Sequence, residues 1–308
     1  LVLSTNLTLT TVQAATVLSR WLGEPVTCDQ VEPLQGGMIN SALRLRFDRA
    51  PGTAVVKLNA DRDNEGLRSE QRRLDYLNAN TQLPVPRVYR YAAADAEVPY
   101  TCLLMETIPG VNLTQATLAP SDRSRVEGQL ADILIELHGH TRQTFGRIHE
   151  PGRASWSDVF VPDLVANRKH VEEKLPVSVL DQIDTAIEVA PAILSEQGVP
   201  TLIHQDIWAG NIMVDQRGDE WHLAGLVDPS GSKFADVECE LAYLQVFDTV
   251  GGTFFDRYTD HHPLRPGYEV RRLFYWLDTY MTHVWLFGDQ SYRDRTAEVA
   301  EAIAAHAG

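Results

Sequence analysis

The chain has 308 residues, 44% hydrophobic and 22% charged, which is the composition of an ordinary globular protein. Its formal net charge of −15 argues against nucleic acid and anionic membrane as partners, because both repel an acidic surface. No apolar run is long enough to span a membrane, and the three cysteines show neither metal-ligand spacing nor a disulfide framework. We therefore expect a cytoplasmic protein of two modest lobes.

The first third of the chain is predicted to form an antiparallel sheet with two helices. Apolar spacing predicts a helix over 10–22, stopped by Gly23, and another over 64–78. Strands are predicted on both sides of Gly36-Gly37, in TAVVKLN at 53–59, in LPVPRVYRYAA and in YTCLLMETIPG.

The Gly36-Gly37 pair is a candidate nucleotide lid. Glycines let a backbone approach phosphates closely, and bare N–H groups bind phosphate oxygens. A plain hairpin turn explains two glycines at least as well, and the G-x-G-x-x-G pattern of protein kinases is missing.

Lys57 ends an apolar strand, which is where a kinase places the amine that binds phosphates. Glu70 lies on the helix that follows, and a carboxylate there can pair with Lys57. The alternatives are a lysine at a sheet edge and a glutamate on the surface, both solvated.

Ile108-Pro109-Gly110 breaks the pattern after the last of these strands. In a kinase this break is the hinge, and the backbone of Glu106, Thr107 and Ile108 would then read the adenine. The prediction is a lobe boundary at residue 108.

The remainder reads as mostly helical. Helices are predicted over 126–137, 163–174, 179–194, 239–247 and 269–287. The last is rich in Tyr, Trp and Phe, which we expect to belong to the core. His138 is expected to complement the dipole at a helix C-terminus rather than to act as a catalyst.

The sequence LIHQDIWAGNIMV at 202–214 holds His204, Asp206 and Asn211 between two short apolar strands, and Asp228 follows in LVDPSG. A phosphotransferase needs an Asp that meets the attacking hydroxyl, and an Asn and a second Asp that hold magnesium. A hairpin whose polar residues only serve its turn is the alternative.

Other catalytic motifs are missing from the sequence: it has no P-loop, no G-x-S-x-G and no H-E-x-x-H. Two classes of function remain, a small-molecule kinase and a catalytically silent kinase-like binding protein. The complete set of Lys57, Asp206, Asn211 and Asp228 favours the enzyme.

Nearly the whole chain resembles the aminoglycoside phosphotransferase-like small-molecule kinases, and most of all the fructosamine (ketosamine) kinases. The resemblance rests on GGMINSALRL, VVKLN, PVPRVY, LLMETIPG, HQDIWAGNI, VDP, ECELAYLQVF and the aromatic tail. It implies an α+β, two-lobed protein-kinase-like fold with a small antiparallel-sheet lobe (1–108) and a larger, mostly helical lobe (109–308). ATP would lie between the lobes, and the enzyme would use Mg²⁺ and act as a monomer.

The resemblance also implies roles for single residues. Asp206 would be the catalytic base, Asn211 and Asp228 would bind Mg²⁺, and His204 would hold the loop. The other implied contacts are Trp208 with the sugar, and Lys57, Glu70, Gly36, Gly37, Asn40, Glu106 and Ile108 with the nucleotide.

The chain departs from the family pattern at three places. Gln205 stands where the family has Gly, so we expect the loop backbone to differ slightly. Met38 replaces a common acidic residue, and the sequence after Asp228-Pro229 lacks the usual His and Arg. The chemistry stays intact, with a ketosamine as the leading acceptor and an aminoglycoside, macrolide or other sugar as the alternative.

Overall fold

The computed structural model describes residues 6–34 and 40–307 of the chain, so Gly36, Gly37 and Met38 lie outside the described residues. The chain divides into two compact units. The first comprises Leu1–Asp122 and Ala209–Ser230, and the second comprises Arg123–Trp208 and Gly231–Gly308. The predicted lobe boundary at residue 108 remains a prediction.

The first unit contains a five-stranded antiparallel sheet, in the strand order β1-β2-β3-β5-β4. The strands are β1 (Cys28–Pro33), β2 (Ser41–Phe47), β3 (Thr53–Asn59), β4 (Val88–Ala92) and β5 (Thr101–Met105). Lys57 lies in the middle of this sheet, opposite Ala42 on β2 and Leu103 on β5.

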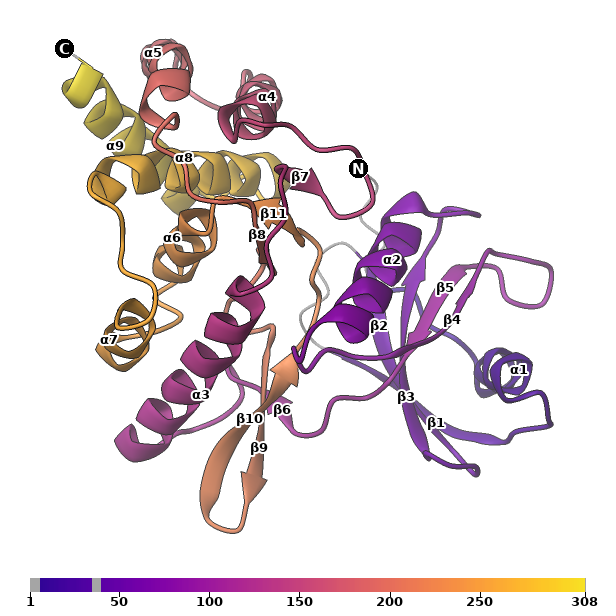
Figure 1. Ribbon diagram of the computed structural model, residues 1–308. Helices are drawn as coiled ribbons and strands as arrows, with labels where there is room; N and C mark the ends of the chain where they lie inside the picture. Colours follow the sequence, from indigo (N-terminus) through magenta and orange to yellow (C-terminus); the bar gives the residue numbers. More distant parts are fainter. Residues whose placement is uncertain (1–5, 35–39, 308) are drawn as a thin grey trace. The chain divides into compact units, whose positions relative to one another are not determined.

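Two helices cover opposite faces of this sheet (Figure 1), because successive strand residues point to opposite sides. Helix α1 (Thr11–Leu22) packs on the face that carries Cys102 and Leu104. Helix α2 (Glu65–Asn80) packs through Leu67 on the face that carries Leu103 and Met105.

The ends of α1 follow the sequence signals closely. Thr10 and Gln13 form a capping box, and Gly23 takes φ +76° and donates to the Ser19 carbonyl. The predicted first helix is therefore confirmed to within one residue.

A second sheet of the first unit has two of the predicted site residues, Asn211 and Asp228, just outside its strands. It consists of β9 (Ile212–Arg217) between β10 (Glu220–Leu226) and the short β6 (Val111–Asn112). Gly110 precedes β6 with φ +88°, and a Cβ at this position would lie 2.0 Å from the Val214 carbonyl oxygen. Only a glycine lets the two backbones approach this closely.

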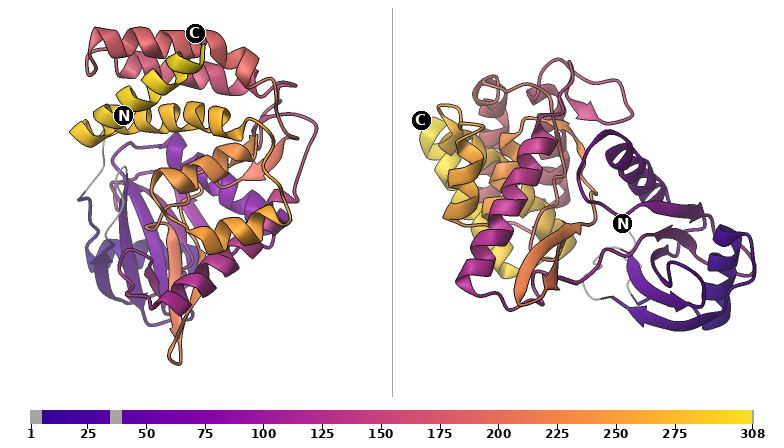
Figure 2. Two further views of the ribbon diagram at one scale, coloured as in Figure 1. Left: turned by 90° about the vertical axis from the view of Figure 1, so that its left-hand side faces the viewer. Right: turned by 60° about the horizontal axis from the view of Figure 1, so that its bottom comes forward.

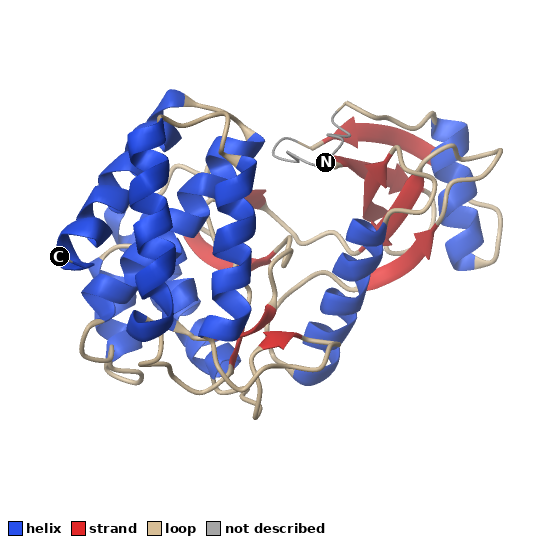
Figure 3. Ribbon diagram, turned by 90° about the horizontal axis from the view of Figure 1, so that it is seen from above, coloured by secondary structure: helices blue, strands red, loops and turns tan. Residues whose placement is uncertain are grey.

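The second unit is mainly helical (Figures 2 and 3). Its helices are α3 (Pro120–His138, whose first turn belongs to the first unit), α4 (Ser157–His170), α5 (Val177–Ile193), α6 (Glu238–Val246), α7 (Gly252–Thr259), α8 (Tyr268–Leu286) and α9 (Gln290–Ala307). Helix α8 contributes Phe274, Tyr275 and Met281 to the core, which confirms that its aromatic stripe is mainly structural. None of the helices in the described part of the chain combines the length and hydrophobicity of a membrane span.

A small sheet of the second unit holds the strand that leads into the loop with His204 and Asp206. Its order is β7 (Gly146–Arg147), β11 (Lys233–Ala235) and β8 (Thr201–Ile203). Strand β8 pairs with β11, whereas β9 pairs with β10 and β6. The two strands on either side of Asp206 therefore belong to different sheets, and the alternative of a plain hairpin is wrong.

The helix predictions fail in a few places. Helix α4 begins six residues before the predicted start at 163, because Trp156 and Phe160 are buried and tie an extra turn to the core. Helices α7 and α9 were not predicted. The apolar side of α9 includes alanine, which gives too weak a pattern to detect.

Candidate active site

Lys57 is held between two carboxylates in the first unit. Its Nζ lies 2.6 Å from Glu70 Oε1 on α2 and 3.0 Å from Asp228 Oδ1, just beyond β10. The Glu70 side chain is only 6% exposed and that of Asp228 is 36% exposed. The pairing of Lys57 with Glu70 that the resemblance implies is thus present, and Asp228 is a second partner.

The two carboxylates keep Lys57 positively charged. Burial by itself would lower the pKa of Lys57, but the charges of Asp228 and then Glu70 outweigh it, and the pKa is raised above its usual value. A buried ammonium that is always charged suits the binding of phosphate oxygens.

Asn211 and Asp228 are brought together by the β9–β10 pairing. Ile212 pairs with Leu226, and just beyond this pair the N–H of Val227 donates to the Asn211 carbonyl at 3.0 Å. Asp228 takes φ +59°, a left-handed conformation that is strained for an aspartate. An amide and a carboxylate offer the oxygen donors that Mg²⁺ prefers, so these two residues fit a magnesium site.

The remaining predicted nucleotide contacts lie in the same unit. Asn40 accepts a hydrogen bond from Asn59 Nδ2 at 2.7 Å. The backbone N–H of Glu106 donates to the Arg87 carbonyl, and the backbone N–H of Arg87 donates to the side chain of Glu106. Thr107 has a buried hydroxyl without a hydrogen-bond partner among the described residues.

Asp206 lies in the second unit, on the loop that follows β8. Tyr243 on α6 donates a hydrogen bond of 2.6 Å from its hydroxyl to Asp206 Oδ1. The Asp206 N–H points at His204 Nδ1, at 3.3 Å. These contacts fix both the backbone and the carboxylate of Asp206.

Glu240 on α6 binds the backbone of the loop that carries Asp206. Its two carboxylate oxygens accept the backbone N–H groups of His204 at 2.7 Å and Gln205 at 2.6 Å. Gln205 takes φ +61°, a region in which a glycine would be unstrained. The two hydrogen bonds from the backbone explain how a glutamine can be kept there.

A short polar chain lies behind Glu240. His138, the last residue of α3, has Nδ1 at 2.6 Å from the Tyr258 hydroxyl and Nε2 at 3.5 Å from Glu240. Burial alone would raise the pKa of Glu240, but the hydrogen bond from His138 and the nearby charges outweigh it, and the pKa is lowered. His138 therefore has an internal partner as well as its position at the helix end.

The predicted site residues thus fall into two groups. Lys57, Glu70, Asn211 and Asp228 belong to the first unit, while Asp206 and Trp208 belong to the second. Trp208 is partly buried and is the last residue before the chain returns to the first unit.

Sequence reasoning missed Tyr243 and Glu240 as individual residues. Both lie in ECELAYLQVF, which carried part of the resemblance without an assigned role. Their contacts join residues 35 to 37 positions apart, so no local spacing could reveal them. A buried acidic residue within an apolar helix was the available signal.

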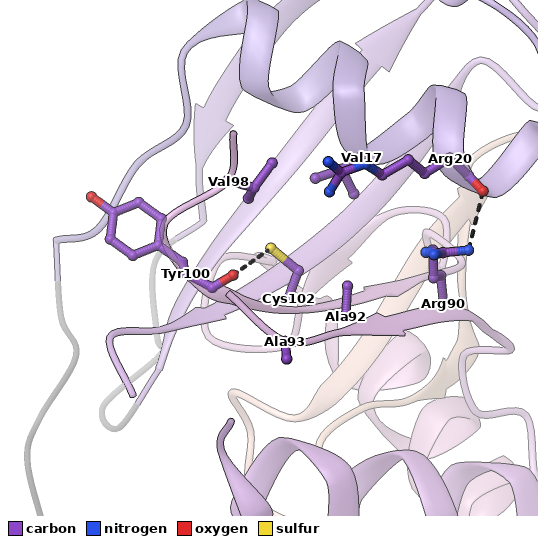
Figure 4. Close-up of a pocket in the computed structure, with 8 residues that line it drawn as sticks. All are labelled: Val17, Arg20, Arg90, Ala92, Ala93, Val98, Tyr100 and Cys102. Carbon is purple, nitrogen blue, oxygen red and sulfur yellow. Dashed lines mark hydrogen bonds between the residues drawn. The ribbon is translucent and has the colours of Figure 1, made fainter. Parts of the chain in front are cut away.

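A small hollow on the first unit, shown in Figure 4, is not part of this site. Val17, Val98 and Cys102 are among its lining residues. Burial raises the pKa of Cys102 to about 12, so its thiol is protonated and unreactive.

The sequence comparisons all find kinases of fructosamines, ketoamines or ketosamines. A sequence profile of the fructosamine kinase family matches residues 10–305. A Staphylococcus aureus (strain NCTC 8325 / PS 47) protein with the name "Probable ketoamine kinase" is 25% identical over 292 residues, which cover 89% of this chain and 93% of that protein. The ketosamine-3-kinase of Mus musculus is 32% identical over 101 residues, or 33% of this chain and 30% of its own.

Solved structures show the same fold. A proposed fructosamine-3-kinase of Haemophilus somnus 129PT aligns with a TM-score of 0.74 and 21% identity over 94% of this chain and 96% of that chain. The GDP complex of wild-type aminoglycoside 2'-phosphotransferase-IIIa aligns with a TM-score of 0.65 and 14% identity over 97% and 99%. The predicted α+β, protein-kinase-like fold is therefore confirmed.

Proposed function

The chain belongs to the fructosamine kinase family, and we propose from this premise that it phosphorylates a hydroxyl group of a ketosamine, with ATP as the donor. It is a phosphotransferase with an alcohol group as acceptor and a small sugar-like molecule as substrate. The observation that carries the proposal is the largely buried Lys57 between Glu70 and Asp228, because a cation fixed in this way has a clear use in binding a nucleotide's phosphates.

The first unit supplies the groups that bind the nucleotide. Lys57 binds phosphate oxygens, and Glu70 keeps its ammonium in place. The backbone of Glu106, Thr107 and Ile108 forms the adenine contact. Asn40 contacts the phosphates, while the lid role of Gly36 and Gly37, which lie outside the described residues, stays a prediction.

Asn211 and Asp228 would hold magnesium, because their oxygen donors suit it. The metal would neutralise charge on the phosphates. Lys57 neutralises Asp228 in the structure as it stands and is then shared between the carboxylates and the phosphates.

Asp206 acts on the acceptor. It orients the substrate hydroxyl, whose oxygen forms a bond to the γ-phosphorus while the bond from that phosphorus to the bridging oxygen of ADP breaks. The proton of the hydroxyl passes to Asp206 late in this step. The hydrogen bond from Tyr243 fixes Oδ1, and Trp208 contacts the sugar.

An aminoglycoside or another sugar is the second candidate acceptor. The structural similarity to aminoglycoside phosphotransferases supports it. The sequence SGSKFADVECELA after Asp228-Pro229, which lacks the usual His and Arg, also weakens the argument for a standard ketosamine.

The test is a coupled assay of ADP release with magnesium and ATP against a panel of acceptors. The panel holds fructosyl-lysine and ribosyl-lysine, free sugars, amino sugars, aminoglycosides and macrolides, with Asp206→Ala as the control. Turnover of glycated amines alone supports the ketosamine acceptor. Turnover of an antibiotic or free sugar would assign the acceptor to that class instead. No turnover of any acceptor, with intact ATP binding, favours a binding protein.

A further inference from the structure

A chain of aromatic rings begins at Asp206. We call it the aromatic row, and it consists of Tyr243, Phe247, His283, Phe287 and Tyr292. The Tyr243 hydroxyl contacts Asp206, and its ring lies 5.3 Å from that of Phe247, centroid to centroid. Phe247 lies 5.2 Å from His283, which in turn lies 5.5 Å from Phe287 and 4.8 Å from Tyr292.

Helical spacing builds the aromatic row within the second unit. Tyr243 and Phe247 are four residues apart at the end of α6, and His283 and Phe287 are four apart at the end of α8. Residues four apart share one face of a helix, so each pair points the same way. Tyr292 on the first turn of α9 closes the row.

The rings of the aromatic row are only partly buried, unlike the core rings beside them. All five members are intermediate in exposure, whereas Phe274 and Tyr275 on the same helix α8 are at most 2% exposed. A half-exposed ring retains apolar surface that a ligand can cover, and such surface next to a catalytic residue is expected to contact the substrate.

The aromatic row is uncharged, with acidic residues beside it. Burial lowers the pKa of His283, and its Nδ1–H donates to the Thr279 carbonyl at 2.8 Å, so the imidazole is neutral at physiological pH. Asp248 follows Phe247 in the chain, Asp289 lies two residues after Phe287, and both are exposed. Arg293 follows Tyr292, and its guanidinium lies near Gly288, so charges of both signs border rings that favour flat apolar groups.

We propose that the aromatic row binds a planar, apolar or aromatic substituent on the amine side of the acceptor. The inference rests on the proposed function, because it places the reacting hydroxyl of the sugar at Asp206. The substituent then lies along Phe247 and the rings beyond it. Tyr243 both fixes the carboxylate and starts the surface on which this substituent packs.

The test compares two acceptors that share one sugar: 1-deoxy-1-methylamino-fructose and 1-deoxy-1-benzylamino-fructose. kcat and KM are measured for the wild type, Phe247→Leu and Phe287→Leu, and calorimetry measures the binding of both acceptors. Phe255→Leu on α7 is the matched control, because Phe255 is also half-buried but its ring packs on Phe254, outside the aromatic row. Thermal unfolding shows that each variant is folded.

We expect the wild type to prefer the benzyl acceptor about five- to tenfold in kcat/KM, through a lower KM, since aromatic pairs add an attraction of this size. Phe247→Leu and Phe287→Leu should remove most of this preference, so that the ratio of kcat/KM for the benzyl acceptor to kcat/KM for the methyl acceptor falls towards one. Phe255→Leu should keep the preference.

Two outcomes overturn the inference while the proposed function stands: equal turnover of both acceptors by the wild type, or the same loss of preference in Phe255→Leu as in Phe247→Leu. If the wild type neither binds nor phosphorylates either acceptor, the proposed function itself fails, and the aromatic row loses its substrate with it.

Discussion

At the scale of single residues, the hydroxyl of Tyr243 already fixes one of the two carboxylate oxygens of Asp206. Asp206→Asn keeps the size of the side chain but removes the ability to accept a proton. We expect kcat to fall about 10²- to 10⁴-fold, the usual contribution of a positioned base, with little change in KM for ATP. Steady-state kinetics measure this, and Asp256→Asn at an exposed site serves as control. Undiminished turnover would remove Asp206 from its role.

A second prediction at this scale concerns the ion pair of Lys57 and Glu70. Glu70→Gln keeps a hydrogen-bond acceptor but lets the ammonium move, so KM for ATP should rise about tenfold, whereas Lys57→Met should also lower kcat strongly. Either change leaves a buried charge with one partner fewer, so a loss of about 2–4 kcal/mol in unfolding free energy is expected. Lys169→Met, at an exposed position, is the control for charge. Unchanged nucleotide kinetics in both variants would contradict the assignment.

At the scale of elements, α6 holds the loop that carries Asp206 through Glu240. In Glu240→Gln one amide oxygen replaces two carboxylate oxygens, so the side chain can no longer accept both N–H groups of His204 and Gln205 well. We expect a loss of about 2–3 kcal/mol of stability, because hydrogen bonds to a buried charge are strong, together with a lower kcat. Urea unfolding and kinetics measure both effects, and exposed Glu298→Gln should change neither.

Gly110 and Gly218 form a matched pair for the β6–β9 contact. Both have positive φ, but a Cβ at Gly110 would lie 2.0 Å from the Val214 carbonyl, while a Cβ at Gly218 would have nothing within 4 Å. Gly218→Ala should cost only about 1 kcal/mol of backbone strain, and Gly110→Ala clearly more, about 3 kcal/mol, because the strands must separate. Urea unfolding compares the two variants. Equal losses of unfolding free energy would show that β6 can move away from β9 at little cost.

At the scale of the whole molecule, buried carboxylates set the response to acid. Burial alone would raise the pKa of Glu238, but hydrogen bonds from Arg271 and Arg265 outweigh it, and the pKa lies below its ordinary value, as it does for Glu240. Such groups stabilise the fold above their unfolded pKa, near 4.3, and this contribution is lost as pH falls further.

Asp278 acts in the opposite direction. Burial raises its pKa to about 6, so its charge opposes folding at neutral pH. Between pH 7 and about 4 its protonation in the folded state should add stability on the order of 2 kcal/mol. Urea unfolding at pH 7.5, 5 and 3.5 should therefore show a maximum near pH 5. Asp278→Asn should flatten the rise, and a wild-type curve that only falls on acidification would refute the argument.

The sequence by itself determined several elements and the family of this protein, and it supplied the candidate residues for the chemistry. The capped first helix, the strand TAVVKLN and the order of His204, Asp206, Asn211 and Asp228 are local patterns, because hydrophobic period, caps and motif spacing act over a few residues. The family followed from the same short motifs.

Only the tertiary structure decided which residues meet across long separations. It placed β8 and β9 in different sheets, gave Lys57 a second carboxylate, and joined Asp206 to Tyr243 and the loop to Glu240. These contacts depend on how helices and strands far apart in the sequence pack, and no local propensity encodes that. The aromatic row, the feature that bears on the acceptor, belongs to this second kind.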